Sequence, residues 1–282
     1  MISHTVRVDS MKTNGLSRCR KVADHHKADF GLLRASFVAT IALALSTTSS
    51  IAGGNDDEDD ETPFDEAELF FELNNTDGDL GIHGFIDGDA WKTLEIENSE
   101  EAQLLLIRST RSLADQGLTE LFFESAEPTF DELAPEDFFA RFPEGEYEIS
   151  GKTIDGQELE SDVSLTHLLP APPNAFVNGE PAAENCDAEL PFVKEPVTIT
   201  WDPVTESHPN LGRTFEPITV VNYEVVVEID ETPFKSSTIL PPTTTSFQVP
   251  FEILALGEEI KFEILVREES FNQTAVESCF LK

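Results

Sequence analysis

Short apolar-rich runs separated by turn residues make up most of the chain beyond residue 68, and they limit it to a fold of many short strands. Leu69–Leu73 is one such run, and the pairs Asp77-Gly78 and Asp87-Gly88 that follow it are predicted turns. Asp155-Gly156 joins Tyr147–Gly151 to residues 159–169, in which apolar positions alternate as they do in a β-hairpin. Further strands are predicted over Val220–Glu228 and Gln273–Leu281. The pattern therefore predicts an all-β fold.

The place where this pattern is interrupted predicts two β-sandwich domains in tandem. Pro170-Ala-Pro-Pro173 fixes the backbone and removes hydrogen-bond donors, so we expect residues 170–174 to form a stiff linker. One sandwich is predicted over residues 68–169 and a second over residues 175–282. The first should hold one short helix that begins at Pro135, because proline suits the first helical position.

The first 52 residues have the composition of a secretory signal peptide. They hold seven of the 18 basic residues, followed by an apolar run over Ala35–Leu45 and small residues up to Ala52. The apolar run is about half the ~20 residues that a membrane span requires, although an uncleaved anchor is the alternative interpretation. Cleavage near Ala52 would place the protein in the periplasm or outside the cell with no membrane span. Residues 53–67 would then begin the chain as an acidic disordered tail.

Acidic residues outnumber basic ones about three to one. The chain has 55 Asp and Glu against 18 Lys and Arg, which gives a formal net charge of −37. Nucleic acids and anionic membrane surfaces are excluded as partners because both require a basic footprint. The expected partner is therefore an unidentified protein or carbohydrate ligand.

The cysteines agree with a secreted protein. Signal cleavage would remove Cys19 and leave Cys186 and Cys279. An even pair of cysteines in an oxidising compartment predicts one disulfide, with two buried free thiols as the alternative.

The carboxy-terminal part resembles a fibronectin type III domain over about residues 175–282. The residues that carry the resemblance are Trp201 with Asp202-Pro203, Tyr223, the Leu254–Gly257 stretch and Phe262. The resemblance implies a β-sandwich that acts as a binding or spacer module. The family usually has tyrosine where this chain has Phe262, so the hydroxyl of the tyrosine corner would be missing there. No family is identified for residues 68–169.

A polar loop over Asn74–Gly81 predicts a Ca²⁺ site, because clustered Asp and Asn oxygens suit this ion. The predicted ligands are Asn75, Asp77, Asp79 and Asp87. The loop is not an EF-hand, since Gly78 at the invariant glycine position would place Leu73 at the first ligand position. A β-turn rich in Asp, Asn and Gly for conformational reasons is the alternative interpretation. Beyond Ca²⁺, no cofactor is expected.

Histidines and tryptophans offer two further candidates. His83, His167 and His208 could form a zinc site only if they converged with carboxylates, and we interpret them as structural or surface residues. Trp91 could form a sugar-binding platform, but a place in the core is the favoured interpretation.

The function predicted from these features is that of a secreted, non-enzymatic binding or spacer protein. No nucleophile elbow, His-Glu-x-x-His motif, phosphate loop or dinucleotide-binding glycine motif occurs in the sequence. The alternative is a carbohydrate-binding accessory protein of a secreted polysaccharide-processing system. A third class, a secreted hydrolase with its site in the first domain, would need a catalytic carboxylate pair that no sequence motif identifies.

Overall fold

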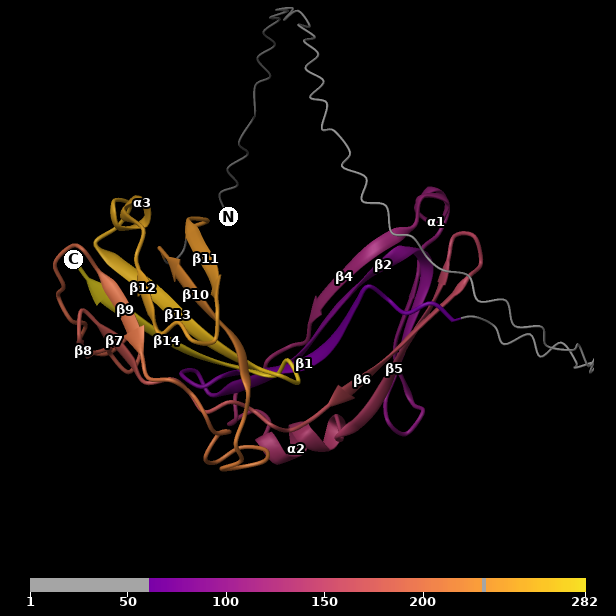
Figure 1. The fold of residues 1–282 in the computed structure, drawn as a ribbon, viewed down its shortest axis with the longest axis horizontal. Helices are drawn as coiled ribbons and strands as arrows, with labels where there is room; N and C mark the ends of the chain where they lie inside the picture. Colours follow the sequence, from indigo (N-terminus) through magenta and orange to yellow (C-terminus); the bar gives the residue numbers. More distant parts are fainter. Residues whose placement is uncertain (1–60, 230–231) are drawn as a thin grey trace, which may run out of the picture. The chain divides into compact units, whose positions relative to one another are not determined.

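The computed structural model describes residues 61–229 and 232–282, so the predicted signal peptide and residues 53–60 of the predicted tail lie outside it. The rest of the predicted tail is ordered, because Phe64 is buried in the core and β1 begins at Glu66. Strands dominate these residues, as predicted (Figure 1). The strands of the first half are β1 (Glu66–Asn74), β2 (Asp79–Glu97), β3 (Gln103–Arg108), β4 (Leu118–Glu124), β5 (Gly145–Thr153) and β6 (Glu158–Leu165). Those of the second half are β7 (Ala175–Val177), β8 (Glu180–Pro181), β9 (Thr198–Trp201), β10 (Val220–Glu228), β11 (Lys235–Leu240), β12 (Ser246–Gln248), β13 (Glu259–Glu268) and β14 (Gln273–Leu281). The helices are α1 (Ser112–Gln116), α2 (Pro135–Arg141) and α3 (Phe251–Leu254).

Strand β2 corrects one prediction, because Asp87-Gly88 is not a turn. The strand continues through it and changes partners, pairing first with β1 and β4 and then with β3 and β5. Register shifts around Trp91 mark the change. A Cβ atom on Gly88 would lie 3.1 Å from Cδ1 of Phe64, so this glycine permits a close approach inside the strand rather than a reversal.

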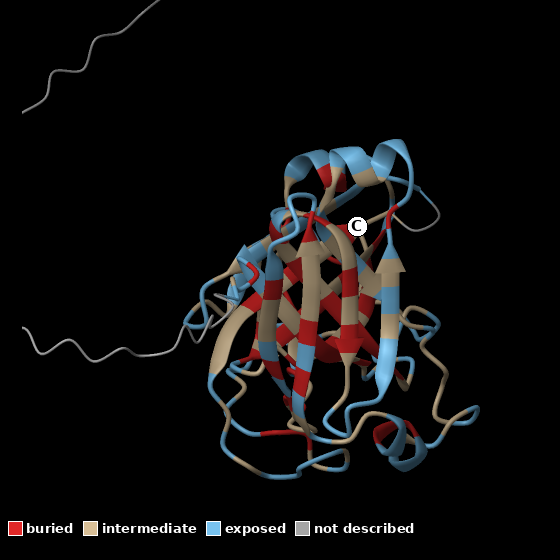
Figure 2. Ribbon diagram, turned by 90° about the vertical axis from the view of Figure 1, so that its right-hand side faces the viewer, coloured by how far each residue is buried: buried red, intermediate tan, exposed pale blue. Residues whose placement is uncertain are grey.

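The first half packs around its own hydrophobic core. Trp91, Tyr147 and Phe71 are completely buried there, and Figure 2 shows buried positions alternating with less buried ones along the strands. The predicted helix is present as α2, and it places Phe138 and Phe139 edge-on against Phe71, with ring centroids 5.7 Å apart in each pair.

The second half is a β-sandwich. The sheet β12-β9-β7-β8 and the strands β11-β10-β13-β14 enclose a core that includes Trp201, Tyr223, Phe262 and Phe280. The hydroxyl of Tyr223 accepts a hydrogen bond from the backbone N–H of Val204, at 3.0 Å. Strands β10 and β14 have the bounds that the sequence pattern predicted.

The tyrosine corner that Phe262 cannot form occurs in the first half instead. Tyr147 lies at the start of β5, and its hydroxyl donates a 2.9 Å hydrogen bond to the carbonyl oxygen of Pro143, four residues earlier. Phe262 is completely buried without needing a polar partner.

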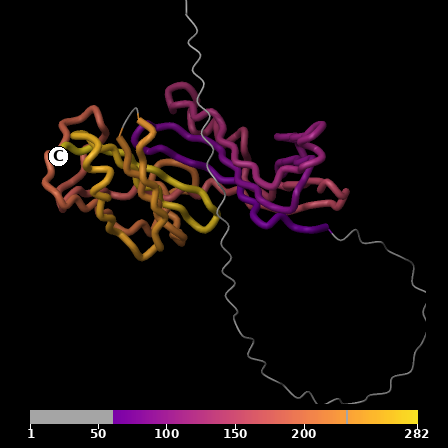
Figure 3. Tube along the Cα trace, turned by 90° about the horizontal axis from the view of Figure 1, so that it is seen from above, coloured from indigo at the N-terminus to yellow at the C-terminus, as the bar shows by residue number. Residues whose placement is uncertain are grey.

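One sheet runs through both halves. Strand β14 pairs in parallel with β1, and these are the last and the first of the described strands, so that the sheet order is β11-β10-β13-β14-β1-β2-β5-β6. The pairing extends from Glu72 opposite Gln273 to Asn74 opposite Ala275. In Figure 3 the yellow trace of β14 reaches the indigo trace of β1. The two hydrophobic cores are therefore separate, but their sheet is shared.

The predicted disulfide is confirmed between Cys186 and Cys279, which are 93 residues apart in the sequence. It attaches the segment before β9 to β14. Within the described residues, no helix combines the length and the apolar character needed to cross a membrane.

Candidate functional site

The predicted Ca²⁺ loop joins β1 to β2 and is tied to β14 by hydrogen bonds. The side-chain oxygen of Asn74 accepts hydrogen bonds from the backbone N–H groups of Thr76 and Asp77, which is an Asx-turn arrangement. The Thr76 hydroxyl in turn accepts from the backbone N–H of Glu277 on β14, at 2.8 Å. The Asn and Asp residues thus shape the turn and hold it against the neighbouring strand.

The structure brings only some of the predicted Ca²⁺ ligands together. Asp77 and Asp79 lie close together, because the charge of Asp77 adds to burial and to the charge of Glu127 in raising the pKa of Asp79. Asn75 instead contacts Nε2 of His208 at 3.1 Å through its side-chain oxygen. Asp87 lies eight residues further along β2 than Asp79, a separation of roughly 26 Å at the usual rise of a strand. Ca²⁺ binding by this loop remains a prediction.

A different set of ligand-type side chains converges beside the loop. Glu72 on β1, His83 on β2 and Glu127 after β4 each present one donor atom, and the three atoms lie within 4.8 Å of one another. Nε2 of His83 lies 3.0 Å from Oε1 of Glu127, and Nδ1 lies 3.7 Å from Oε2 of Glu72. We call these three residues the junction triad, because Glu72 lies opposite Gln273 where β1 meets β14.

Local backbone contacts bring Glu127 to this position. Ser125 exchanges hydrogen bonds with Ile82, its hydroxyl accepting from the N–H and its own N–H donating to the carbonyl. These contacts hold the segment after β4 along β2. A Cβ atom on Gly81 would lie 2.6 Å from Oε1 of Glu127, so only glycine leaves room for this carboxylate above the strand.

Negative charge accumulates around the triad. Burial raises the pKa of Glu72, against the opposing effect of His83. Burial, followed by the charges of Glu127 and Asp77, raises the pKa of Asp79 to about 6. Burial and then the charge of Glu72 raise the pKa of Glu263 on β13 to about 8. This patch therefore favours any cation that relieves the repulsion.

Lys261 relieves part of the negative charge next to the triad. Its ammonium group lies 2.8 Å from Oε2 of Glu277 and 3.7 Å from Oε1 of Glu228. Glu277 is on β14 and Glu228 is on β10, while the carboxylate of Glu72 accepts a hydrogen bond from Gln273.

The other histidines and Trp91 have structural environments. His167 stacks on Phe139, with ring centroids 4.4 Å apart, and its Nε2 contacts the carbonyl oxygen of Phe142 at 2.8 Å. His208 contacts Asn75, as described above, so each histidine has its own partners. Trp91 is completely buried, which confirms its place in the core and rules it out as a sugar-stacking surface.

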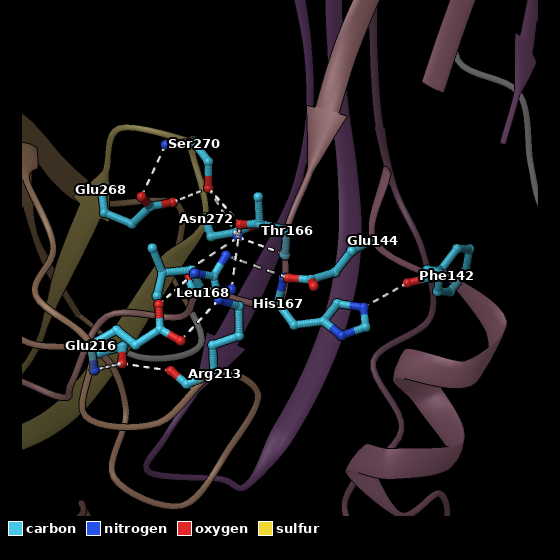
Figure 4. A network of polar contacts seen from close by, with 11 residues as sticks. Phe142, Glu144, Thr166, His167, Leu168, Arg213, Glu216, Glu268, Ser270 and Asn272 are labelled. Carbon is cyan, nitrogen blue, oxygen red and sulfur yellow. Dashed lines mark hydrogen bonds and ion pairs between the residues drawn. The ribbon is translucent and has the colours of Figure 1, made fainter. Parts of the chain in front are cut away.

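The best-connected polar side chain in the described residues is that of Asn272, at the turn between β13 and β14 (Figure 4). Its amide group donates to the carbonyl oxygens of Thr166 and Leu168, at 2.8 and 3.2 Å. Its side-chain oxygen accepts from the backbone N–H of Phe71 on β1, at 2.8 Å. Asn272 is completely buried and thus fastens the end of the first half, β1 and β14 to one another.

No sequence motif identifies the junction triad or the Asn272 network. Their contacts include pairs that are remote in sequence, such as His83–Glu127, 44 residues apart, and Phe71–Asn272, 201 residues apart. The local signal in the sequence for the junction triad is His83, a histidine within a predicted strand. Its carboxylate partners follow only from the register of β1, β2 and β4.

Comparison with known proteins places the chain in no family. No family model matches it, and no curated protein matches it. Among solved structures, the chain is similar to one from work on host cell surface retention of a 1.5-MDa bacterial ice-binding adhesin. The TM-score is 0.23 at 12% sequence identity, and the match covers 78% of this chain and 65% of that one. A two-domain fibronectin type III segment of chicken tenascin matches with a TM-score of 0.27 at 10% sequence identity, and the match covers 77% of this chain and 98% of that one. This chain thus spans slightly less than two thirds of the adhesin chain.

Proposed function

We propose that the chain is a secreted, non-enzymatic module that acts as a stiff spacer or binding arm in the periplasm or outside the cell. The observation that carries the proposal is the parallel pairing of β14 with β1, which continues one sheet from one hydrophobic core into the next. Domains joined by a flexible linker usually move relative to one another. Backbone hydrogen bonds across the connection restrict that motion.

The segment between the two cores supports this proposal. Three of its backbone carbonyls accept hydrogen bonds from β14 or the turn before it: Thr166 and Leu168 from Asn272, and Pro170 from the hydroxyl of Thr274 at 2.8 Å. The backbone N–H of Ala171 also donates to the carbonyl of Glu206. A segment held at so many points cannot swing as a free linker does.

Two further properties suit a role outside the cytoplasm. The Cys186–Cys279 disulfide is of the kind that persists in oxidising compartments. The large acidic excess keeps individual molecules apart in solution, so that the arm stays soluble.

The proposal is tested by measuring distances between spin labels across the connection. One label replaces Glu100 in the first half and the other replaces Thr243 in the second, both at exposed positions. A stiff arm gives a narrow distance distribution, as narrow as that of a control pair at Glu100 and Glu136 within the first half. Asn272→Ala should broaden the first distribution and leave the control unchanged. A broad distribution across the connection in the unaltered protein would refute the spacer role.

A further inference from the structure

We infer that the junction triad Glu72–His83–Glu127 is a binding site for a divalent transition-metal ion of the Zn²⁺ type. This inference is independent of the proposed spacer role. Imidazole nitrogen and carboxylate oxygen are both ordinary ligands of Zn²⁺, at bond lengths of about 2.0–2.2 Å. Two ligands of one tetrahedral ion are then separated by roughly 3.3 Å. Nε2 of His83 and Oε1 of Glu127 lie 3.0 Å apart, close to that value, and one donor atom from each of the three residues lies within 4.8 Å of the other two.

His83 separates this site from an ordinary acidic surface. It is only 4% exposed, and its imidazole packs against the rings of Phe70 and Phe122, with centroids 5.4 and 6.1 Å away. The two aromatic rings restrict the rotation of the imidazole, which can bind an ion through one of its nitrogens. A histidine that is held in this way loses little freedom when it binds an ion.

The carboxylates come from elements that are themselves fixed. Glu72 belongs to the short parallel pairing with β14, and its other neighbour on the sheet is Gly81 of β2. Glu127 lies above that same glycine. Because Gly81 has no side chain, the space between the two carboxylates above β2 is left to the ligands.

The donor set also indicates which ion the site would select. Ca²⁺ and Mg²⁺ prefer shells made only of oxygen, whereas a site with imidazole nitrogen suits Zn²⁺ and its neighbours. The inferred site is therefore distinct in chemistry from the Ca²⁺ loop predicted at Asp77 and Asp79, although the two are adjacent. Three protein ligands leave one position of a tetrahedral shell for water or for a group from a partner.

The experiment is Zn²⁺ binding to the full chain by isothermal titration calorimetry after treatment with EDTA, with Ca²⁺ titrated separately. The variants are His83→Gln and Glu127→Gln. Asp87→Asn serves as the matched control, because this carboxylate is on the same strand but far from the triad. Any Zn²⁺ bound by His4, His25 or His26 is common to all of these proteins, so the differences between them report only the triad.

We expect Zn²⁺ to bind at one equivalent to the triad, and each triad variant to weaken this binding at least tenfold. Asp87→Asn and Asp77→Asn should leave the Zn²⁺ affinity within twofold. Visible absorption of the Co²⁺-loaded protein supplies a second readout, since the bands of a nitrogen- and oxygen-ligated ion should be lost in Glu127→Gln even if His83→Gln folds poorly. Equal affinity for Ca²⁺ and Zn²⁺, or Zn²⁺ binding unchanged in both triad variants, would overturn the assignment.

Discussion

The side-chain amide of Asn272 donates a 2.8 Å hydrogen bond to the carbonyl oxygen of Thr166, a residue 106 positions earlier in the chain. The same side chain accepts a hydrogen bond from Phe71, so a single asparagine joins three segments that are remote in sequence. Buried polar groups of this kind are costly when a partner is removed, because the remaining groups have no access to water.

Asn272→Ala should therefore lower the free energy of unfolding by about 3 kcal/mol, since two or more buried backbone groups lose their partner at about 1–3 kcal/mol each. Urea denaturation followed by circular dichroism measures the change. Asn174→Ala is the control, because its amide bonds Asp202 on the exposed surface and its loss should cost less than about 0.5 kcal/mol. Similar losses in the two variants would contradict the role assigned to Asn272.

Replacing both disulfide cysteines should also destabilise the protein. The bridge closes a loop defined by a sequence separation of 93 residues, and cross-links of that span typically stabilise by about 2–4 kcal/mol. We expect a Cys186→Ala, Cys279→Ala double variant to lose about 3 kcal/mol in urea denaturation. Alanine is chosen because Cys279 is buried and a serine hydroxyl would need a new partner. A loss below about 1 kcal/mol would show that the bridge constrains the unfolded chain little.

Glu263 should make stability depend on pH. Its carboxyl binds a proton more tightly in the folded protein, with a pKa of about 8, than in the unfolded chain, where glutamate titrates near ~4.3. This stabilisation is complete below the unfolded pKa, declines as pH rises, and is lost above about pH 8, with a slope of at most ~1.4 kcal/mol per pH unit.

Glu263→Gln should therefore flatten the pH dependence of the unfolding free energy between about pH 5 and pH 8 and stabilise the protein at the alkaline end. Denaturation in EDTA at several pH values measures this. Glu252→Gln, an exposed substitution in α3, should leave the slope unchanged. A Glu263→Gln variant with the slope of the unaltered protein would show that this carboxyl does not titrate as proposed.

Loss of the hydroxyl in the tyrosine corner should lower the free energy of unfolding by less than the loss of Asn272 or of the disulfide. Tyr147→Phe removes one hydroxyl, whose 2.9 Å bond to Pro143 ties β5 to the end of the preceding loop. The expected loss is about 1 kcal/mol in the free energy of unfolding, because an intramolecular hydrogen bond contributes about 0.5–1.5 kcal/mol. Thermal unfolding should show a lower Tm with the same cooperativity, and an unchanged Tm would leave the hydroxyl without a stabilising role.

The elements that the sequence predicted well are those with strong local signals. Apolar-rich runs predicted the bounds of β10 and β14, and Pro135 predicted the start of α2. The predicted Asp87-Gly88 turn was wrong because glycine also serves close packing within a strand, here against Phe64. Local pattern cannot distinguish these two uses.

The features that join the two halves could not be predicted from the sequence. No turn residues mark the parallel pairing between β1 and β14, which are far apart in the sequence. The partners of His83 depend on the register of three strands. Asn272 lies in the polar turn between β13 and β14, and only its burial reveals its role. The division into domains at residues 170–174 remains a prediction.

The pairing of β14 with β1 also sets an order of events during biosynthesis. Among the described strands, β14 is synthesised after all the others, and contacts such as Phe71–Asn272 span 201 residues. While the chain is still emerging, the edge of β1 that will receive β14 has no partner, so an incomplete molecule exposes an open strand edge. A chain that lacks β14 would keep its first half, but it would lose the pairing of β14 with β1 and leave the edge of β1 open.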